Sequence, residues 1–276
     1  MTLLAGILIV LVADAVAIGA MLLVRRRAPE GSYFTDGDRA SGVFGVLATG
    51  FAVLLGLVVV LAFTSYDESR AGAETEALTL AQQFEVAHLM PEAPGRQLAG
   101  ELICYGRSVV HREWPAMEDG SLGDVINPWS AALFRTLKLA NPNGPTEESA
   151  YDKWLDQTSD REEARRDRVH GASGIIPESI WIVLFITASV VFAYMLFFAD
   201  SGEHARSQAM LMGSATTIVV VTLLAIISLD NPYGSGVGAI RPAAMERSLR
   251  LLDQVRVVVG DDSPLPCDAD GVAAAR

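Results

Sequence analysis

The stretch SGVFGVLATGFAVLLGLVVVLAFT, residues 41–64, decides the fold of this chain. It contains no charged side chain, and it exceeds the ~20 apolar residues that cross a ~30 Å hydrocarbon core as a helix. Three other stretches are almost as apolar, so the sequence predicts four membrane-spanning helices. These stretches are residues 2–24, 180–199 and 209–229.

The composition excludes several classes of protein. The chain has 276 residues and a formal net charge of −12, which is unsuited to a nucleic-acid binder because phosphate backbones need neutralising. Its only cysteines are Cys104 and Cys267, too few for a multi-bridge secreted scaffold or a CxxC metal cluster. One disulfide at most can form, and the sequence leaves open whether it does.

The polar segments between the spans predict an all-α integral membrane protein with a helical hydrophilic domain inserted between helices two and three. No alternating strand pattern of useful length occurs in them. We expect four parts: residues 1–64 with the first two spans, the connector 65–177, residues 178–229 with the last two spans, and the tail 230–276. Predicted helices outside the spans are 67–90, 95–112, 128–139, 147–168 and 242–258.

Arginines near the span ends favour one orientation in a bacterial cytoplasmic membrane. Residues 25–27 are three arginines directly after the first span, and Arg39 and Arg206 lie in the two short loops. Because Lys and Arg mark cytoplasmic loops, the connector and tail are expected on the extracytoplasmic side. Other arginines oppose this orientation: Arg161, Arg165, Arg166, Arg168, Arg241, Arg247 and Arg250.

Asp14 lies near the middle of the first span, where an ionised carboxylate costs at least ~3 kcal/mol. Such a residue normally faces a bundle interior or a wet cavity, which suggests ion passage, proton transfer or helix association. Alternatively, Asp14 is protonated and bonded to a hydroxyl of a neighbouring span. Thr217 in the fourth span is a candidate for a polar path, although threonines also bond back to their own helix.

The second span carries small residues on roughly one face. Five small residues follow one another at intervals of three or four: Ser41, Gly45, Thr49, Ala52 and Gly56. Small side chains let helix backbones approach closely, so this face predicts close helix contact. The partner is either another helix of the same chain or a neighbouring subunit.

No residue pattern commits the chain to catalysis, a cofactor or a metal. The charged run at 160–168, DREEARRDR, is interpreted as a solvated helix face, with an anion-attracting arginine patch as the alternative. GASG at 171–174 matches the serine motif of rhomboid proteases, but the spans contain no histidine to act as base. DADG at 268–271 begins like a calcium loop and lacks the remaining ligands. We therefore expect no enzyme.

Short motifs lie in a fixed order over about residues 20–245. They are the basic cluster 25–27, the segment LAFTSYDESR at 61–70, Glu76, Glu113, Trp114, Pro115, Asp230, Pro232 and Gly234. In this order they resemble a family of bacterial bestrophin-like membrane proteins.

Bestrophins are pentameric anion channels whose second helix lines the pore. The residues that leave that helix in bestrophins are similar to a membrane-interface motif in this chain: Ser65, Tyr66, Asp67, Arg70 and Glu76. The resemblance implies a homo-oligomer in the lipid bilayer that passes small anions. It also implies a cytoplasmic connector, opposite to the orientation that the arginines favour.

A second function is compatible with the same sequence. A non-conducting membrane sensor or assembly protein would use the acidic helical domain to bind a partner. Ion flux separates the two hypotheses.

Overall fold

The computed structural model describes residues 2–120 and 127–274 of the chain. In these residues the secondary structure is helical, apart from an isolated bridge between Cys267 and Ala273. The predicted all-α class is confirmed. The helices are α1 (Leu3–Arg25), α2 (Gly37–Ala87), α3 (Glu92–Ser108), the π-helix Val109–Glu113, α4 (Trp114–Glu118), α5 (Pro128–Leu137), α6 (Pro145–His170), the 3₁₀ turn Gly171–Ser173, α7 (Glu178–Phe197), α8 (Ala205–Asp230) and α9 (Ala243–Val259).

Four helices are long and apolar enough to cross a membrane, namely α1, α2, α7 and α8. Each corresponds to one of the four predicted spans, and the protein is therefore a multi-pass membrane protein. The second span runs on into the predicted helix at 67–90. It is the first half of the 51-residue helix α2, which continues without a break into the hydrophilic part of the chain.

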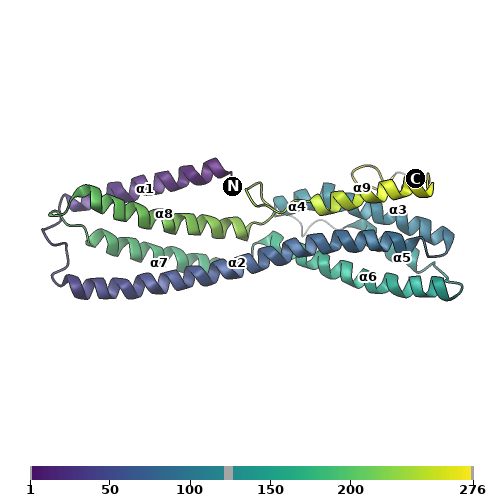
Figure 1. Ribbon diagram of the computed structural model, residues 1–276, viewed down its shortest axis with the longest axis horizontal. Helices are drawn as coiled ribbons and strands as arrows, with labels where there is room; N and C mark the ends of the chain where they lie inside the picture. Colours follow the sequence, from purple (N-terminus) through teal and green to yellow (C-terminus); the bar gives the residue numbers. More distant parts are fainter. Residues whose placement is uncertain (1, 121–126, 275–276) are drawn as a thin grey trace. The chain divides into compact units, whose positions relative to one another are not determined.

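The chain forms two compact units. In Figure 1 the colours follow the sequence, so each unit contains several colours. The membrane unit comprises Met1–Ser65, Gly174–Asp230 and Ser235–Gly238. The hydrophilic unit comprises Tyr66–Ser173, Asn231–Gly234 and Ala239–Arg276.

In the membrane unit, α1 lies beside α8, and the apolar core joins α2, α7 and α8 (Figure 1). The core is built from Phe51, Leu55, Val58, Leu184, Ala188, Val191 and Ile226. Most other apolar side chains of these helices are exposed on the isolated chain, for example Val46 and Val60. Such a surface suits lipid or neighbouring subunits, because lipid tails are as apolar as the side chains themselves.

The short loops of the membrane unit are fixed to one another. The Arg25 side chain donates hydrogen bonds to the backbone oxygens of Asp200 and Ser201, each at 3.1 Å. The Asp200 carboxylate in turn accepts from the backbone nitrogen of Gly31 at 3.0 Å. The first arginine of the basic cluster therefore holds the two loops at one end of the four helices together.

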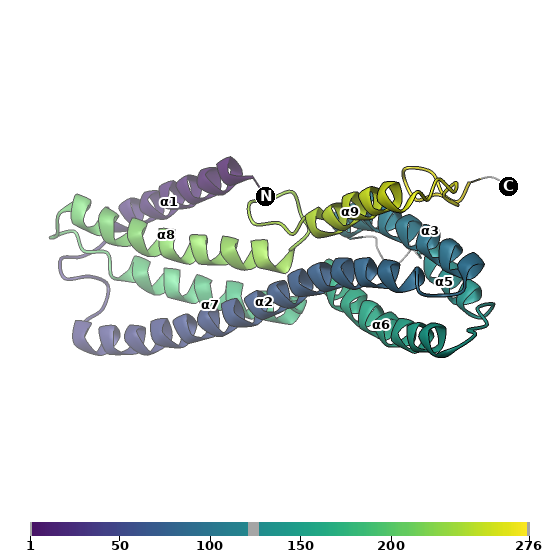
Figure 2. The ribbon, with the colours of Figure 1, turned by 45° about the vertical axis from the view of Figure 1, so that its right-hand side comes forward.

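In the hydrophilic unit, helices α3, α5, α6 and α9 pack with the second half of α2 around one apolar core. Figures 1 and 2 both show α9 lying along α3. Gly72 is the point where α2 meets α6, since a Cβ placed there would lie 2.6 Å from the backbone nitrogen of Arg168 and 2.7 Å from the backbone oxygen of Ala164. Only glycine permits this approach, which is closer than any real Cβ contact.

A disulfide attaches the tail to α3. It joins Cys104 and Cys267, which are 163 residues apart and both buried. Beside it, the Trp129 indole nitrogen donates to the backbone oxygen of Gly271 at 2.7 Å. The tail is thus an integral part of the core, and the question of cysteine pairing that the sequence left open is answered.

The third predicted connector helix begins as expected. Asn127 caps α5 by accepting a hydrogen bond from the backbone nitrogen of Trp129 at 3.1 Å, and Pro128 occupies the first turn, where its missing N–H costs nothing. The predicted end of the second connector helix, at Arg112, is wrong. The chain remains helical beyond Pro115, to Glu118, because a π-helical turn precedes the proline.

We predict that Gly72→Ala lowers the stability of the protein. The added methyl group forces α2 away from α6, at a cost of about 1–3 kcal/mol. Thermal unfolding of the purified protein in detergent would show a melting temperature lower by about 2–4 °C for each kcal/mol. Gly19→Ala is the control, because nothing lies within 4 Å of a Cβ at Gly19. Equal melting temperatures for Gly72→Ala and the wild type would contradict the prediction.

Candidate functional site

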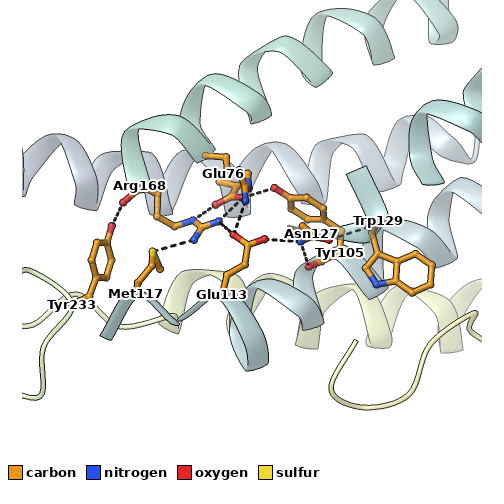
Figure 3. A network of polar contacts seen from close by, with 9 residues as sticks. Glu76, Tyr105, Glu113, Met117, Asn127, Trp129, Arg168 and Tyr233 are labelled. Atoms are coloured by element: carbon orange, nitrogen blue, oxygen red, sulfur yellow. Dashed lines mark hydrogen bonds and ion pairs between the residues drawn. The ribbon is translucent and has the colours of Figure 1, made fainter. Parts of the chain in front are cut away.

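A buried guanidinium lies at the centre of a polar network in the hydrophilic unit (Figure 3). Arg168 of α6 donates to both oxygens of Glu76 on α2, from Nε at 2.5 Å and from Nη2 at 3.1 Å. Its Nη2 also donates to Glu113 of the π-helix at 2.7 Å. All three side chains are fully buried, so one residue from each of three helical segments meets at a single charge cluster.

Three further side chains complete the hydrogen bonds and ion pairs of the two carboxylates. The Tyr105 hydroxyl of α3 donates to Glu76 at 2.5 Å, and the Asn127 amide donates to Glu113 at 2.8 Å. Arg165 approaches Glu113 at 3.3 Å from the edge of the cluster. Each oxygen of both carboxylates therefore has a donor, which is the condition for burying such charges.

Pro115 explains how Glu113 reaches the cluster. A proline inside a helix removes one backbone hydrogen bond and clashes with the carbonyl four residues earlier. Here the chain widens into a π-turn over Val109–Glu113, and the backbone nitrogen of Trp114 bonds to the oxygen of Val109, five residues back. Such turns are rare and are often found at functional sites.

Aromatic side chains close the other end of the network. The Tyr233 hydroxyl donates to the backbone oxygen of Arg168, and its ring meets Trp114 edge-on at 5.5 Å. The Arg168 guanidinium lies 5.7 Å from the Trp114 ring centre, within range of a cation–π contact. A cavity of about 180 Å³ adjoins this end, and its lining includes Asp119, Pro232 and Gly234.

Burial and neighbouring charges together set the pKa values of these groups. Burial alone would raise the pKa of Glu113, but Arg168 and Arg165 hold it below its ordinary value. Burial would lower the pKa of Arg168, yet Glu76 and Glu113 raise it instead. The pKa of Tyr105 lies well above its ordinary value because of burial and the Glu76 charge. At neutral pH Glu113 and Arg168 are therefore charged and Tyr105 is not.

The geometry of the cluster joins α2, α6 and the π-helix, because its guanidinium and carboxylates face one another. Among residues 2–120 and 127–274, no three His, Cys, Asp or Glu side chains gather in a way that could hold a metal ion.

The predicted membrane-interface motif divides between two sides of α2. Glu76 is in the buried cluster and Ser65 is buried, whereas Asp67 and Arg70 are exposed and Tyr66 is half-buried. Arg70 pairs with Glu74 one turn further along the helix, at 3.2 Å. Only one of the five residues therefore belongs to the network.

The family-like motifs divide in a similar way. Glu113 and Trp114 belong to the network, and Pro115 shapes the turn that carries them. Asp230, in the membrane unit, accepts from the backbone nitrogens of Ile175 and Ile176 at 2.7 and 2.9 Å. Asp230 thus fixes the chain just before α7.

The polar candidates within the spans also form two groups. The Thr217 hydroxyl of α8 donates to Asp14 of α1 at 2.8 Å, which is the inter-span contact that one of the two alternatives for Asp14 required. Gly45, Thr49 and Gly56 of α2 are exposed instead. No atom of another described segment lies within 4 Å of a Cβ placed at either glycine, so the described part of the chain leaves these positions uncovered.

The sequence interpretation of residues 160–168 as a solvated face is wrong for one side of the helix. Arg161 and Arg168 are buried, with 2% and 0% of their surface exposed. The buried positions of α6 follow a spacing of three and four residues: Ala150, Trp154, Gln157, Arg161, Ala164 and Arg168. Charged side chains at these positions conceal a periodicity that apolar residues would have revealed. Tyr105 of α3 was part of no sequence motif and was missed as well.

Comparison with known proteins gives a consistent likeness. The bestrophin-like domain matches residues 9–245. A crystal structure of a tryptophan-to-alanine variant of a bacterial bestrophin homologue from Klebsiella pneumoniae is similar in fold, with a TM-score of 0.63 and 13% identity over 89% of this chain and 96% of that one. A crystal structure of a membrane protein with a glycine-to-alanine substitution gives a TM-score of 0.67 and 12% identity, over 92% of this chain and 98% of that one. No curated protein sequence matches the chain.

We predict that Glu113→Gln destabilises the protein by about 3–5 kcal/mol at neutral pH, because it leaves Arg168 with part of its buried charge uncompensated. The lowered pKa of Glu113 means that its ionised form stabilises the fold above the ordinary glutamate range, and that this contribution is lost as the pH falls through the folded-state value. The difference in melting temperature between variant and wild type should therefore shrink in acid.

The matched control is Glu118→Gln, since Glu118 pairs with Arg241 on the surface at 3.2 Å. An exposed pair of this kind contributes about 0–1 kcal/mol. If both variants lost the same stability, the buried ion pairs of the cluster would not stabilise the fold more than an exposed pair does.

Proposed function

Because this chain belongs to the bestrophin-like family, we propose that it assembles as a homo-oligomer around α2 and conducts small ions across the bacterial membrane. Small anions are the proposed ions, in keeping with the resemblance to bestrophin channels. The observation that carries the proposal is the small-residue face of α2, which no part of the described chain covers.

Several features of this face and its helix support the proposal. Gly45 and Gly56 expose helix backbone that nothing described lies near, so another helix can approach there without side-chain conflict. The face belongs to the longest helix of the chain, which carries Glu76 in its second half. Thr49, between the glycines, presents a hydroxyl where ions could be hydrated. Asp14 is directed to Thr217 instead, so we assign it to helix association.

We further propose that the connector and tail are extracytoplasmic. The Cys104–Cys267 disulfide supports this, because disulfides form and persist in oxidising compartments. Arg25, which joins the two short loops, belongs to the basic cluster, and basic loops stay in the cytoplasm. The family likeness favours the reverse orientation.

A non-conducting sensor or assembly protein is the second candidate. It is favoured by the exposed side of α6, which is strongly acidic and would suit a basic partner. The exposed acidic residues are Glu148, Asp152, Asp156, Asp160, Glu162, Glu163 and Asp167. Capture of a partner without ion flux, unaffected by Asp14→Asn, would favour this candidate.

The orientation can be measured with two single cysteines added to the otherwise native protein, whose own cysteines are paired. Ser159→Cys lies on the exposed side of α6, and Ser207→Cys lies at an exposed position in the first turn of α8. A membrane-impermeant maleimide should label Ser159→Cys in intact cells and Ser207→Cys only after the cells are opened. The opposite pattern would place the connector in the cytoplasm, as in bestrophins.

The assembly is tested with Gly56→Leu, which should lower both the oligomer fraction and the chloride or iodide flux of reconstituted liposomes by about tenfold or more, given the typical cost of overpacking. Gly19→Leu is the control, because Gly19 is also exposed and has no atom near a Cβ. Wild-type flux no greater than that of empty liposomes would count against conduction. Full assembly of Gly56→Leu would count against the interface.

A further inference from the structure

Helix α9 leaves one side uncovered in the hydrophilic unit. It buries Met245 and Leu252 against the core, whereas Val257 and Val258 have 80% and 85% of their surface exposed. Exposed residues recur along the open side at intervals of four and three, and none of them is acidic. We call them the α9 stripe: Ala243, Arg247, Arg250, Gln254 and Val257. The stripe is basic in its first half and apolar at its end.

Helix α6 carries a complementary row, the α6 stripe, at intervals of three and four: Glu148, Tyr151, Leu155, Thr158 and Glu162. Its two carboxylates belong to an exposed side of the helix that is acidic overall. Within residues 2–120 and 127–274, no ion pair reaches Glu148 or Glu162. Leu155 is 43% exposed, so this stripe also combines charge with an apolar side chain. Surfaces of opposite charge favour contact with each other and disfavour contact with themselves.

The two helices lie on opposite sides of the hydrophilic unit, as Figures 1 and 2 both show. Helix α6 ends beside the turn from which the chain enters α9. A Cβ placed at Gly171 would lie 3.1 Å from Pro232, whose backbone oxygen accepts from the nitrogen of Ile240 at 2.8 Å. Helix α6 therefore runs towards this turn and α9 runs away from it. Rotation about an axis along these helices would set α9 of one copy antiparallel beside α6 of the next.

We propose that the α9 stripe docks on the α6 stripe of a second copy of this chain. The inference rests on the homo-oligomer proposed above and names the surfaces of the hydrophilic unit that meet, and it depends on neither ion conduction nor orientation in the membrane. In an antiparallel pair the intervals of the two stripes coincide. Three layers then face one another, one charged, one polar and one apolar: Arg250–Glu162, Gln254–Thr158 and Val257–Leu155.

The contact is head-to-tail, because two different stripes on opposite sides of the unit meet. Each copy offers α9 to one neighbour and α6 to another, and contacts of this kind close into a ring when the rotation permits. A standard interface buries roughly 800 Å² on each partner, which is more than one helix pair supplies. The stripes therefore add to the contact between the spans. Ser159 lies about 100° around the helix from Thr158, so docking leaves it open to solvent.

The contact is tested with Leu155→Cys and Val257→Cys placed in one otherwise native chain and treated in isolated membranes with a short bifunctional maleimide. Cys104 and Cys267 are buried and joined to each other, so they do not react. The double variant should give a ladder of covalent oligomers on a denaturing gel. Each single variant is the control and should remain one band, since the same position on two copies does not meet in a head-to-tail contact.

The outcomes separate this inference from the proposed assembly. A ladder in either single variant would show a like-to-like contact and overturn the inference. A double variant without a ladder would overturn it as well. In that case a wild-type oligomer that Gly56→Leu disrupts would leave the contact between the spans standing, whereas a monomeric wild type would remove the proposed homo-oligomer too.

Charge reversal measures the same contact independently. Arg250→Glu should raise the dissociation constant of the purified full-length oligomer about tenfold at low salt, because two carboxylates then face each other. Adding Glu162→Arg to the same chain should restore assembly.

The matched control for the charge reversal is Arg96→Glu, which should assemble as the wild type does. Arg96 is an exposed arginine that pairs with Glu92 one turn away, at 3.2 Å. Arg250 pairs with Glu246 in the same way, at 3.9 Å. Wild-type assembly of Arg250→Glu, or no recovery in the double variant, would overturn the pairing.

Discussion

Arg168 reaches across the interior of the hydrophilic unit to Glu76, 92 residues earlier in the chain, and the packing of the unit depends on this ion pair. A buried charge is tolerated only when its partners are in place, since an unpaired one costs several kcal/mol. That requirement explains several local features at once. Gly72 lets α2 approach α6 closely enough for the pair to form, and the π-turn before Pro115 brings Glu113 to the same guanidinium.

The membrane unit depends on a different constraint. Its core is small, and a polar contact between spans joins Asp14 to Thr217, while no described residue covers the glycines on the small-residue face of α2. Helices in a bilayer associate through close packing and hydrogen bonds rather than through the hydrophobic effect. A unit with so much unpaired helix surface is suited to assembly, and the hydrophilic unit, with its disulfide and buried ion pairs, is suited to be rigid.

Fold and orientation are separate properties of such a protein. A likeness at 12–13% identity carries the fold, and the same fold can be inserted in either direction if the basic residues and the cysteines allow it. In this chain the disulfide and the arginines after the first span favour one direction, and the family likeness favours the other. The buried position of both cysteines indicates a structural bond rather than a redox-active one.

The sequence by itself determined the four spans, the all-α class and the start of α5, because apolar length and local helix signals act over short distances. It also carried the motif order that matched the family. Only the tertiary structure decided which charged residues are buried. Arg161 and Arg168 look like solvent-exposed arginines in sequence, since periodicity reports hydrophobicity and cannot show that a charge has a partner 92 residues away. The disulfide and the ion-pair cluster exist because distant segments meet, and that meeting is a property of the packed chain alone.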